Sequence, residues 1–289
     1  MSKGDKPLAA LREELNRIDD ALHDLIMERA TVAEYVRAQK HNNAVWRPAR
    51  EAQILRRLLM RHEGPFPHAT IVQIWREIVS AMVRLQDEFR VAVYSTETSL
   101  ICRQLVRDHF GNGTPVLPYT STQAVLKAVE EGAVTIGVLP IPQNKEKEPW
   151  WTSFGDRAGG DLTVCAKLPF VQNPQENEHA ALCVGNIPPE ESGKDKSLYI
   201  FRTKTAASRE KLAQKSAAAG IKFERLIHHR SSFSGSSVFL TELDGYVPPG
   251  DPRVARLIHS DTVAADAVVF LGTYAAPLEL SDFMEEKRT

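Results

Sequence analysis

The sequence of 289 residues has few cysteines and no long apolar run. Its three cysteines, Cys102, Cys165 and Cys183, lie far apart and form none of the close-spaced patterns of metal sites or disulfide-rich domains. We expect buried, reduced thiols and therefore a cytoplasmic protein. No segment approaches the ~20 apolar residues of a membrane span, and residues 1–17 are charged rather than signal-like, which predicts no export.

An excess of charge of one sign is also missing. The 36 Lys and Arg residues balance the 37 Asp and Glu residues, for a formal net charge of -1. This balance argues against a protein that binds nucleic acid or an anionic membrane surface. Hydrophobic residues at 43% and charged residues at 25% are typical of a globular protein, and the length is enough for two or three domains.

The most regular feature present is an apolar stripe in residues 8–40. Its members recur at alternating gaps of three and four, which predicts one long amphipathic helix with a seam like that of a coiled coil. They are Leu8, Leu11, Leu15, Ile18, Leu22, Leu25, Val32 and Val36. At ~1.5 Å per residue the helix is roughly 50 Å long, too long for a small domain on its own.

Two cations interrupt this stripe. Arg29 takes its one missing place, and Lys40 continues the row after the last apolar member. A cation in a buried row is costly unless its head reaches the surface or meets an anion. Either solution would explain one such residue. Two on one row, with Arg12 one position from Leu11, favour a site for a small molecule that carries carboxylates.

Two shorter helices are predicted next. Pro48 opens one that runs to about residue 61, and breakers at 64–67 separate it from another. The apolar face of this third helix comprises Ile71, Ile74, Trp75, Ile78, Met82, Leu85 and Phe89. Three helices of such unequal length cannot close a core alone, so we expect a homodimer in which the long helices cross and exchange partners.

From about residue 90 short apolar runs alternate with helical segments, which predicts an α/β unit with parallel pairing. The predicted strands are 90–95, 114–119, 134–141, 162–171 and 179–185, and the predicted helices are 98–109 and 121–131. The polar residues 143–160 are predicted to form a loop, and residues 187–196, with paired prolines and charges, form a candidate linker.

A second α/β pattern covers the end of the chain. Its order of strand, helix, strand, strand, helix, strand is that of ferredoxin-like ligand-sensing modules. The segments are strands 197–203, 225–230, 237–247 and 267–274 and helices 208–219 and 252–264, with the two middle strands able to pair as a hairpin. His228 and His229 suggest a metal at first sight, but neighbours on a strand point to opposite faces, so a structural role is favoured.

The helical part contains LREELNRID at 11–19, Glu28–Arg29, Lys40, ARE at 49–51 and Gln86. With these residues it resembles the all-helical type of chorismate mutase. VTIGVLPI at 134–141 is similar to a dehydratase strand and VVFLGTY at 268–274 to the closing strand of an ACT domain, so the order of modules resembles the bifunctional chorismate mutase/prephenate dehydratase family. The implied fold is multidomain α + α/β. It has a three-helix mutase domain at 1–90 that forms an intertwined dimer, a truncated periplasmic-binding-protein-like dehydratase module at 91–190, and a ferredoxin-like ACT-type regulatory domain at 191–289.

In that family the mutase rearranges chorismate to prephenate for aromatic amino-acid biosynthesis, without a cofactor, a metal or a covalent intermediate. The resemblance implies that Arg29 binds one substrate carboxylate and that Arg12 of the partner subunit binds the other. Guanidinium groups suit a dianion because each can bind a carboxylate through two hydrogen bonds. Such binding also holds the flexible substrate in its reactive conformation.

The same resemblance assigns the remaining site residues. Lys40 and Gln86 would donate to the ether oxygen, where negative charge grows as the bond breaks. Arg50 would order the site, and Glu51 would accept a hydrogen bond from the substrate hydroxyl. Structural alternatives remain open: Arg12 could form a helical ion pair, Glu51 could suit the helix dipole, and Gln86 could be plain surface.

This chain departs from the family pattern at several places. Arg47 and Met82 stand where the family has Asp and Ser, although Arg47 could itself serve the dianion. The dehydratase motif Thr-Arg-Phe is replaced by His179, Ala180 and Ala181, and the middle module is too short for a second lobe, so no dehydratase activity is expected. The last module keeps Arg230 but lacks the Gly-containing turn that binds phenylalanine, so another amino acid or a plain dimer contact is as plausible as phenylalanine.

Three hypotheses follow. The first is a homodimeric chorismate mutase whose C-terminal modules regulate or support it, with an amino-acid effector at the last module as one form of regulation. The second is a binding protein for chorismate, prephenate or an amino acid that regulates a partner enzyme without chemistry. The third and weakest is a retained prephenate dehydratase.

Overall fold

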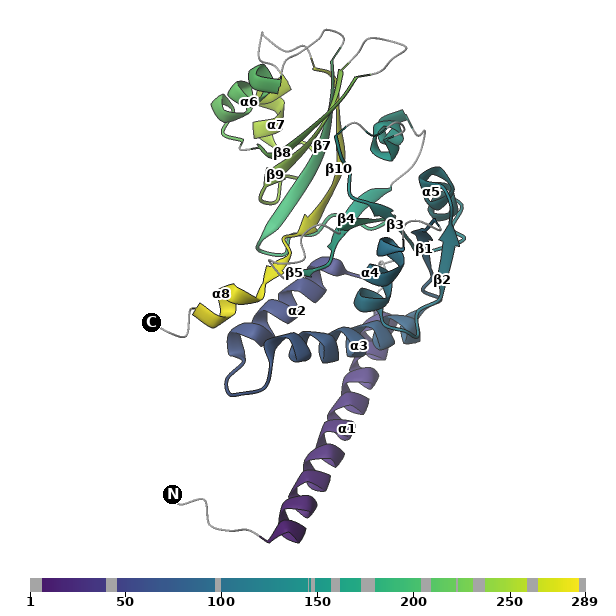
Figure 1. Cartoon of the computed structure of the whole chain (residues 1–289), viewed down its shortest axis with the longest axis vertical. Helices are drawn as coiled ribbons and strands as arrows, with labels where there is room; N and C mark the ends of the chain where they lie inside the picture. Colours follow the sequence, from purple (N-terminus) through teal and green to yellow (C-terminus); the bar gives the residue numbers. More distant parts are fainter. Residues whose placement is uncertain are drawn as a thin grey trace.

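The computed structural model describes residues 7–39, 46–96, 100–144, 146, 149–156, 162–172, 180–203, 209–221, 223–230, 237–258 and 265–285. A helical N-terminal region is followed by a large mixed α/β sheet, and α2 and α3 lie between α1 and this sheet (Figure 1). Lys40 and His179, which were named above, fall outside the described residues.

The first helix, α1 (Leu8–Gln39), is one uninterrupted helix as predicted. It extends away from the rest of the molecule (Figure 1), so its apolar stripe has no cover over most of its length. Leu22 and Leu25 are 54% and 61% exposed. In its C-terminal half Ile26 and Ala33 are half-buried, and the helix contacts α3.

The other two helices, α2 (Pro48–Arg61) and α3 (His68–Gln86), pack against the sheet region. On α2 the residues Ala52, Leu55 and Leu59 form a cluster with Phe170 and Leu278 from the sheet region. Their apolar surface is therefore buried within the chain, and it supplies a hydrophobic stabilisation that α1 lacks.

The apolar face predicted for α3 was partly wrong. Ile74 and Leu85 are exposed, while Arg76 and Ser80 are buried. The buried face carries polar groups because hydrogen-bond partners meet them across the interface with the sheet region, which a purely apolar pattern does not reveal. Phe89 lies beyond the end of the helix and packs edge-on against Trp46.

The sheet has nine strands in the order β2-β1-β3-β6-β4-β10-β7-β9-β8. Its strands are β1 (Val91–Tyr94), β2 (Val116–Tyr119), β3 (Ile136–Pro140), β4 (Thr163–Leu168), β6 (Ala181–Gly185), β7 (Asp195–Thr203), β8 (Phe223–Arg230), β9 (Ser237–Asp244) and β10 (Ala265–Ala275). The predicted parallel pairing is confirmed, since β1 pairs parallel with both β2 and β3. Helix α4 (Ile101–Phe110) connects β1 to β2, and α5 (Thr122–Glu130) connects β2 to β3. Strand β6 pairs antiparallel with β3 and β4.

The second half of the sheet follows the predicted order of strands and helices. Strands β8 and β9 pair as the expected antiparallel hairpin, and α6 (Arg209–Ala218) and α7 (Pro252–Ile258) supply the helices. Strand β10 lies between β7 and β4, so the sheet continues across the segment predicted to be a linker. Gly272 makes this junction possible, because a Cβ there would lie 2.1 Å from the Val164 carbonyl oxygen.

The predicted loop at 143–160 was wrong in part. It contains a short 3₁₀ helix, η1 (Trp150–Asp156), in which Trp150 and Trp151 are almost fully buried. The Trp150 indole donates to the Pro140 carbonyl oxygen at 3.0 Å. The polar residues around the two tryptophans led to the prediction of a loop. Burial of the two large aromatic side chains outweighs the polarity of these flanking residues and fixes the segment.

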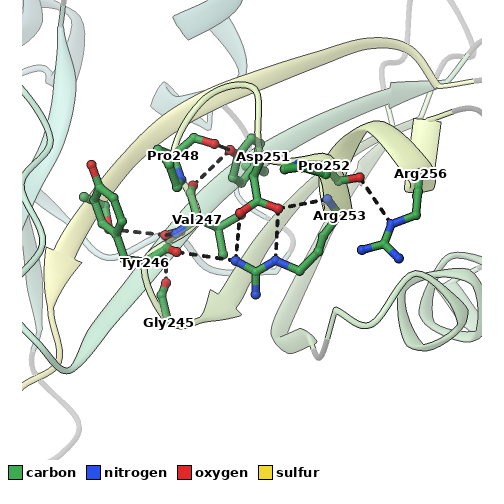
Figure 2. A network of polar contacts seen from close by, with 11 residues as sticks. Gly245, Tyr246, Val247, Pro248, Asp251, Pro252, Arg253 and Arg256 are labelled. Atoms are coloured by element: carbon green, nitrogen blue, oxygen red, sulfur yellow. Dashed lines mark hydrogen bonds and ion pairs between the residues drawn. The ribbon is translucent and has the colours of Figure 1, made fainter.

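A polar network fixes the loop between β9 and α7 (Figure 2). The Tyr199 hydroxyl on β7 lies 3.0 Å from the Val247 carbonyl oxygen and 2.9 Å from that of Pro248, and it can donate a hydrogen bond to either. Arg253 donates to the Asp251 carboxylate through Nε at 2.9 Å and Nη2 at 2.8 Å. The two-point pair holds the start of α7 and lowers the pKa of Asp251.

Two short strands lie outside the main sheet. Strand β5 (Val171–Gln172) pairs with β11 (Leu278–Glu279), and α8 (Leu280–Glu285) follows β11 in the chain.

Candidate active site

The two arginines that α1 contributes to the predicted site lie far apart. Arg12 is exposed near the N-terminal end of the helix, and Arg29 is half-buried, where burial lowers its pKa. Seventeen residues of one straight helix separate them, which is roughly 25 Å. Arg12 and Arg29 of one copy therefore cannot bind the same small molecule.

The arginines at the start of α2 have different surroundings. Arg47 forms a two-point ion pair with Glu190, with both nitrogens 3.0 Å from the carboxylate oxygens. Arg50 is exposed and makes a long contact of 3.4 Å to the side-chain oxygen of Gln53. In this arrangement Arg47 ties α2 to the segment before β7, while the guanidinium of Arg50 is accessible.

Glu51 points in the opposite direction, toward the sheet region. Its carboxylate accepts from the Trp46 indole at 3.1 Å and from Arg76 Nη1 at 3.2 Å. The same Arg76 nitrogen lies within hydrogen-bond distance of His109 Nδ1 on α4. The side chains of Glu51 and Arg76 are each 8% exposed, so this is a buried ion pair between α2 and α3 that reaches the sheet region.

The third helix completes the predicted set. Gln86 is its last residue and is partly exposed, and Met82, one turn earlier, is buried. Among the described residues of one copy, the predicted site residues do not converge: Arg12 lies at the far end of α1, Arg50 faces solvent and Glu51 faces the sheet region.

Sequence reasoning missed several functional contacts of the helical region. Arg56 on α2 donates to the carbonyl oxygens of Ser192, Lys194 and Ala276 at 2.8, 2.9 and 3.0 Å. On α3 a polar row spaced by four residues, Arg76, Ser80 and Arg84, faces the end of α4. This spacing on one helix face was the available signal.

Residues 11–87 match the family model described as chorismate mutase type II. The match begins in the first turn of α1 and ends just beyond α3, so it covers the helical region and nearly all of its length. The resemblance of this region to chorismate mutase is confirmed.

Longer proteins similar to this chain are named as chorismate mutases joined to prephenate dehydratases. A "Bifunctional chorismate mutase/prephenate dehydratase" of Pseudomonas aeruginosa is 30% identical over 170 residues, covering 56% of this chain and 46% of the relative. One from Stutzerimonas stutzeri is 31% identical over 177 residues, covering 58% and 47%. The matches thus span about half the length of these chorismate mutase relatives.

Solved structures similar to this chain include prephenate dehydratases. One from Streptococcus mutans has a TM-score of 0.46 and 17% sequence identity, and the comparison covers 65% of this chain and 98% of that one. Another, from Arthrobacter aurescens in complex with L-Phe, has a TM-score of 0.46 and 14% identity, covering 65% and 90%.

The part of the chain that the structure describes contains no cluster of three or more His, Cys, Asp or Glu side chains placed to hold a metal ion. It contains no helix that is both long and apolar enough to cross a membrane. His228 stacks on Phe239, and His229 meets Trp151 edge-on.

Proposed function

We propose that the chain catalyses the rearrangement of chorismate to prephenate as a homodimer. The observation that carries the proposal is the match of α1 to α3 with chorismate mutase type II, which includes Arg12, Arg29, Arg50, Glu51 and Gln86. The conversion is intramolecular, so a site that binds, orients and stabilises charge is sufficient, and no cofactor is required by the residues proposed here.

The proposed site lies between two copies of α1. Because roughly 25 Å separates Arg12 from Arg29 on one helix, a dianion held by both types of arginine must receive them from different protomers. The exposed stripe of α1 supports this arrangement, since a second α1 would cover it by the coiled-coil packing that its spacing favours. Arg29 would bind one carboxylate, and Arg12 of the partner subunit would bind the other.

The remaining residues would act on the reacting bond and on the ring. Lys40 and Gln86 would donate to the ether oxygen as it gains negative charge, which favours the transition state over the bound substrate. Arg50, whose guanidinium is accessible, would help to order the site. Arg47 would add positive potential near the dianion and Glu51 would accept from the substrate hydroxyl, and both roles require these side chains to leave their partners in this structure, Glu190 for Arg47 and Arg76 for Glu51.

The sheet region would have a supporting role. We assign residues 1–90 to the mutase domain, 91–190 to a truncated dehydratase-like module and 191–289 to an ACT-like domain that could bind an amino-acid effector. The strand order β10-β7-β9-β8, with α6 and α7 in the connections, supports the ACT-like assignment because it is the order of a ferredoxin-like sheet.

The test is to incubate the purified protein with chorismate and to follow the loss of its absorbance, with acid treatment to convert prephenate to phenylpyruvate. We expect turnover by the wild-type protein and by Arg17→Ala, an exposed arginine off the apolar stripe, and almost none by Arg29→Ala. Saturable chorismate binding without prephenate would instead indicate a binding protein. Phenylpyruvate formed from prephenate without acid would indicate a dehydratase.

A further inference from the structure

One face of the mixed sheet has a pocket between the parts assigned above to the dehydratase-like and ACT-like modules. The loop after β3 contributes Ile141 and Pro142, and β6 contributes Leu182. Strands β7, β8 and β9 contribute three aliphatic and two charged side chains, which are Leu198, Ile227, Leu240, Arg225 and Glu242. One chain supplies this lining, and all of it lies beyond the match with chorismate mutase type II.

Arg225 is held at the pocket by the loop after β3. Its Nη2 donates to the Pro142 carbonyl oxygen at 2.6 Å, and the structure describes no other hydrogen bond of this guanidinium. Glu146 lies near enough for its charge to interact with Arg225, but its carboxylate accepts from the Gln143 backbone amide. Among the described residues no carboxylate forms an ion pair with Arg225. The half-buried guanidinium therefore has N–H donors left for an anion.

Glu242 is the acid of the pocket. It is the register partner of Arg225 on β8 and of Leu198 on β7, so these side chains share one face of the sheet. The Tyr274 hydroxyl lies near its carboxylate, and burial together with this charge raises the pKa of Tyr274. Lys167 on β4 lies over the Tyr274 ring, with Nζ 5.8 Å from the ring centre. No described cation forms an ion pair with Glu242, so its oxygens can still accept from a cation.

The rest of the lining is apolar. Leu182, Leu198, Ile227 and Leu240 are buried members of a core cluster that joins both parts of the sheet. The pocket has about 250 Å³ of empty space, part of which is open to solvent. A guanidinium binds a carboxylate through two hydrogen bonds, a carboxylate accepts from an ammonium group, and an aliphatic wall favours contact with apolar groups. An α-amino acid with an apolar side chain presents all three features in one small molecule.

We propose that this pocket binds a free α-amino acid with an apolar side chain: Arg225 binds its carboxylate, Glu242 binds its ammonium group, and the aliphatic wall contacts its side chain. The ligand would touch the loop after β3 and strands β8 and β9 at once, so its binding would join the two parts of the sheet within one chain. The inference rests on the proposed function only where this ligand is taken as the effector of the mutase.

The test is isothermal titration calorimetry of the full chain with L-leucine and with L-phenylalanine. We expect saturable binding of at least one of them. Arg225→Gln and Glu242→Gln each remove one charged partner, and each should raise the dissociation constant at least about tenfold. Arg256→Gln is the matched control and should bind like the wild-type protein. Arg256 is exposed on α7, which packs through Val254 against Tyr199 on the opposite face of the sheet.

Two analogues test the same contacts in the wild-type protein, so the result does not depend on whether a variant folds. The amide of the bound amino acid lacks the carboxylate that Arg225 would bind. The corresponding acid without its amino group lacks the ammonium that Glu242 would bind. Each analogue should bind at least about tenfold more weakly than the parent amino acid.

Two results would overturn the site. One is the absence of binding of both amino acids, and the other is binding that keeps its affinity in both Arg225→Gln and Glu242→Gln, which would place the ligand elsewhere. Calorimetry does not require turnover, so the two proposals can fail separately. A wild-type protein that binds the amino acid through these residues but leaves chorismate unchanged would refute the mutase function and support the site.

Discussion

Helices α1 and α2 belong to the same chorismate mutase-like region but bury their surfaces in different ways. The apolar stripe of α1 faces solvent along most of its length, with Leu22 54% exposed. Helix α2 buries Leu55 and Leu59 fully and adds Arg47 and Arg56 as polar contacts to the sheet region. Within the part of the chain that the structure describes, α2 is thus covered along its apolar face, whereas α1 contacts α3 but keeps its apolar stripe exposed.

This difference divides the roles of the two helices. The contacts of α2 and α3 can form inside one chain, so they determine how the helical region attaches to the sheet. The stripe of α1 has the residue spacing of an interface with another helix, and Arg29 lies in the same row. The exposed apolar face of α1 is therefore also the face on which we propose that the substrate binds. Binding of a second copy and completion of the site would then be one event.

The largest effect is expected from a charge on the stripe of α1. Leu22→Lys loses the burial of two leucines per dimer, about 2 kcal/mol each, so the dimer dissociation constant should rise at least about a thousandfold. Asp20→Lys is the matched control, since Asp20 is exposed and lies off the stripe. Light scattering across a range of protein concentrations measures both. Equal masses for the two variants would show that the stripe is not the interface.

The buried pair of α2 and α3 should contribute strongly to stability. Glu51→Ala leaves the guanidinium of Arg76 buried without its anion, and we expect a loss of about 3–5 kcal/mol in the free energy of unfolding. The exposed neighbour Arg50→Ala should change it by less than about 0.5 kcal/mol. Urea unfolding measures both, with Glu51→Gln as a milder variant if Glu51→Ala does not fold. Similar midpoints for Glu51→Ala and Arg50→Ala would argue that the pair is not formed.

On α1 the substitution Arg29→Ala should remove activity and leave the helix and its stripe intact. A guanidinium that binds a carboxylate of the bound substrate is expected to contribute at least about a hundredfold to kcat/KM. The assay of chorismate loss, with the mass of the variant measured in parallel, tests both halves of this prediction. Ordinary turnover in a folded, dimeric Arg29→Ala would remove Arg29 from the site.

The polar contacts of α2 should be weaker than its buried pair. Arg56→Ala loses hydrogen bonds to three backbone carbonyls, and we expect destabilisation of about 1.5–3 kcal/mol. Arg57→Ala, on the exposed side of the same helix, is the control. A difference of less than about 0.5 kcal/mol between the two variants would indicate that these contacts add nothing to the attachment of α2.

The smallest effect concerns pH. In the folded protein the pKa of His109 is lowered well below its usual value, whereas in the unfolded chain the ring binds a proton below about pH 6.5. The free energy of unfolding therefore decreases as the pH falls through that value. The contribution is at most about 1.4 kcal/mol for each pH unit below it. His109→Gln should therefore lose less stability than the wild-type protein between about pH 7 and about pH 5.5. An unchanged slope would show that His109 is accessible to protons in the folded state.

Much of the fold followed from periodicity. The extent of α1, the parallel pairing of β1 with β2 and β3, and the hairpin of β8 and β9 were all predicted from apolar spacing and breakers. These features depend on local patterns, which one sequence displays directly. The continuity of the sheet from β4 to β10 was not predictable in this way, since strand order depends on contacts between distant residues.

The site was predictable only through the resemblance. Residue types suggested a ligand with carboxylates, and Arg12, Arg29 and Gln86 lie within the residues that match chorismate mutase type II, but their roles stay a prediction. The contacts of Glu51 with Arg76 and of Arg76 with His109 could not be foreseen, because they join three helices that are separated in the chain. Apolar spacing assigned Ile74 and Leu85 of α3 to the core, where the structure places Arg76 and Ser80.

The most direct test of the account mixes two inactive proteins, Arg12→Ala and Arg29→Ala, after dissociation and reassembly. If each site takes Arg29 from one protomer and Arg12 from the other, a mixed dimer contains one site with both arginines. Half of the reassembled dimers are mixed and half of their sites are intact, so the mixture should recover about a quarter of the wild-type activity. Wild-type activity with no recovery in the mixture would contradict a site shared between two copies of α1.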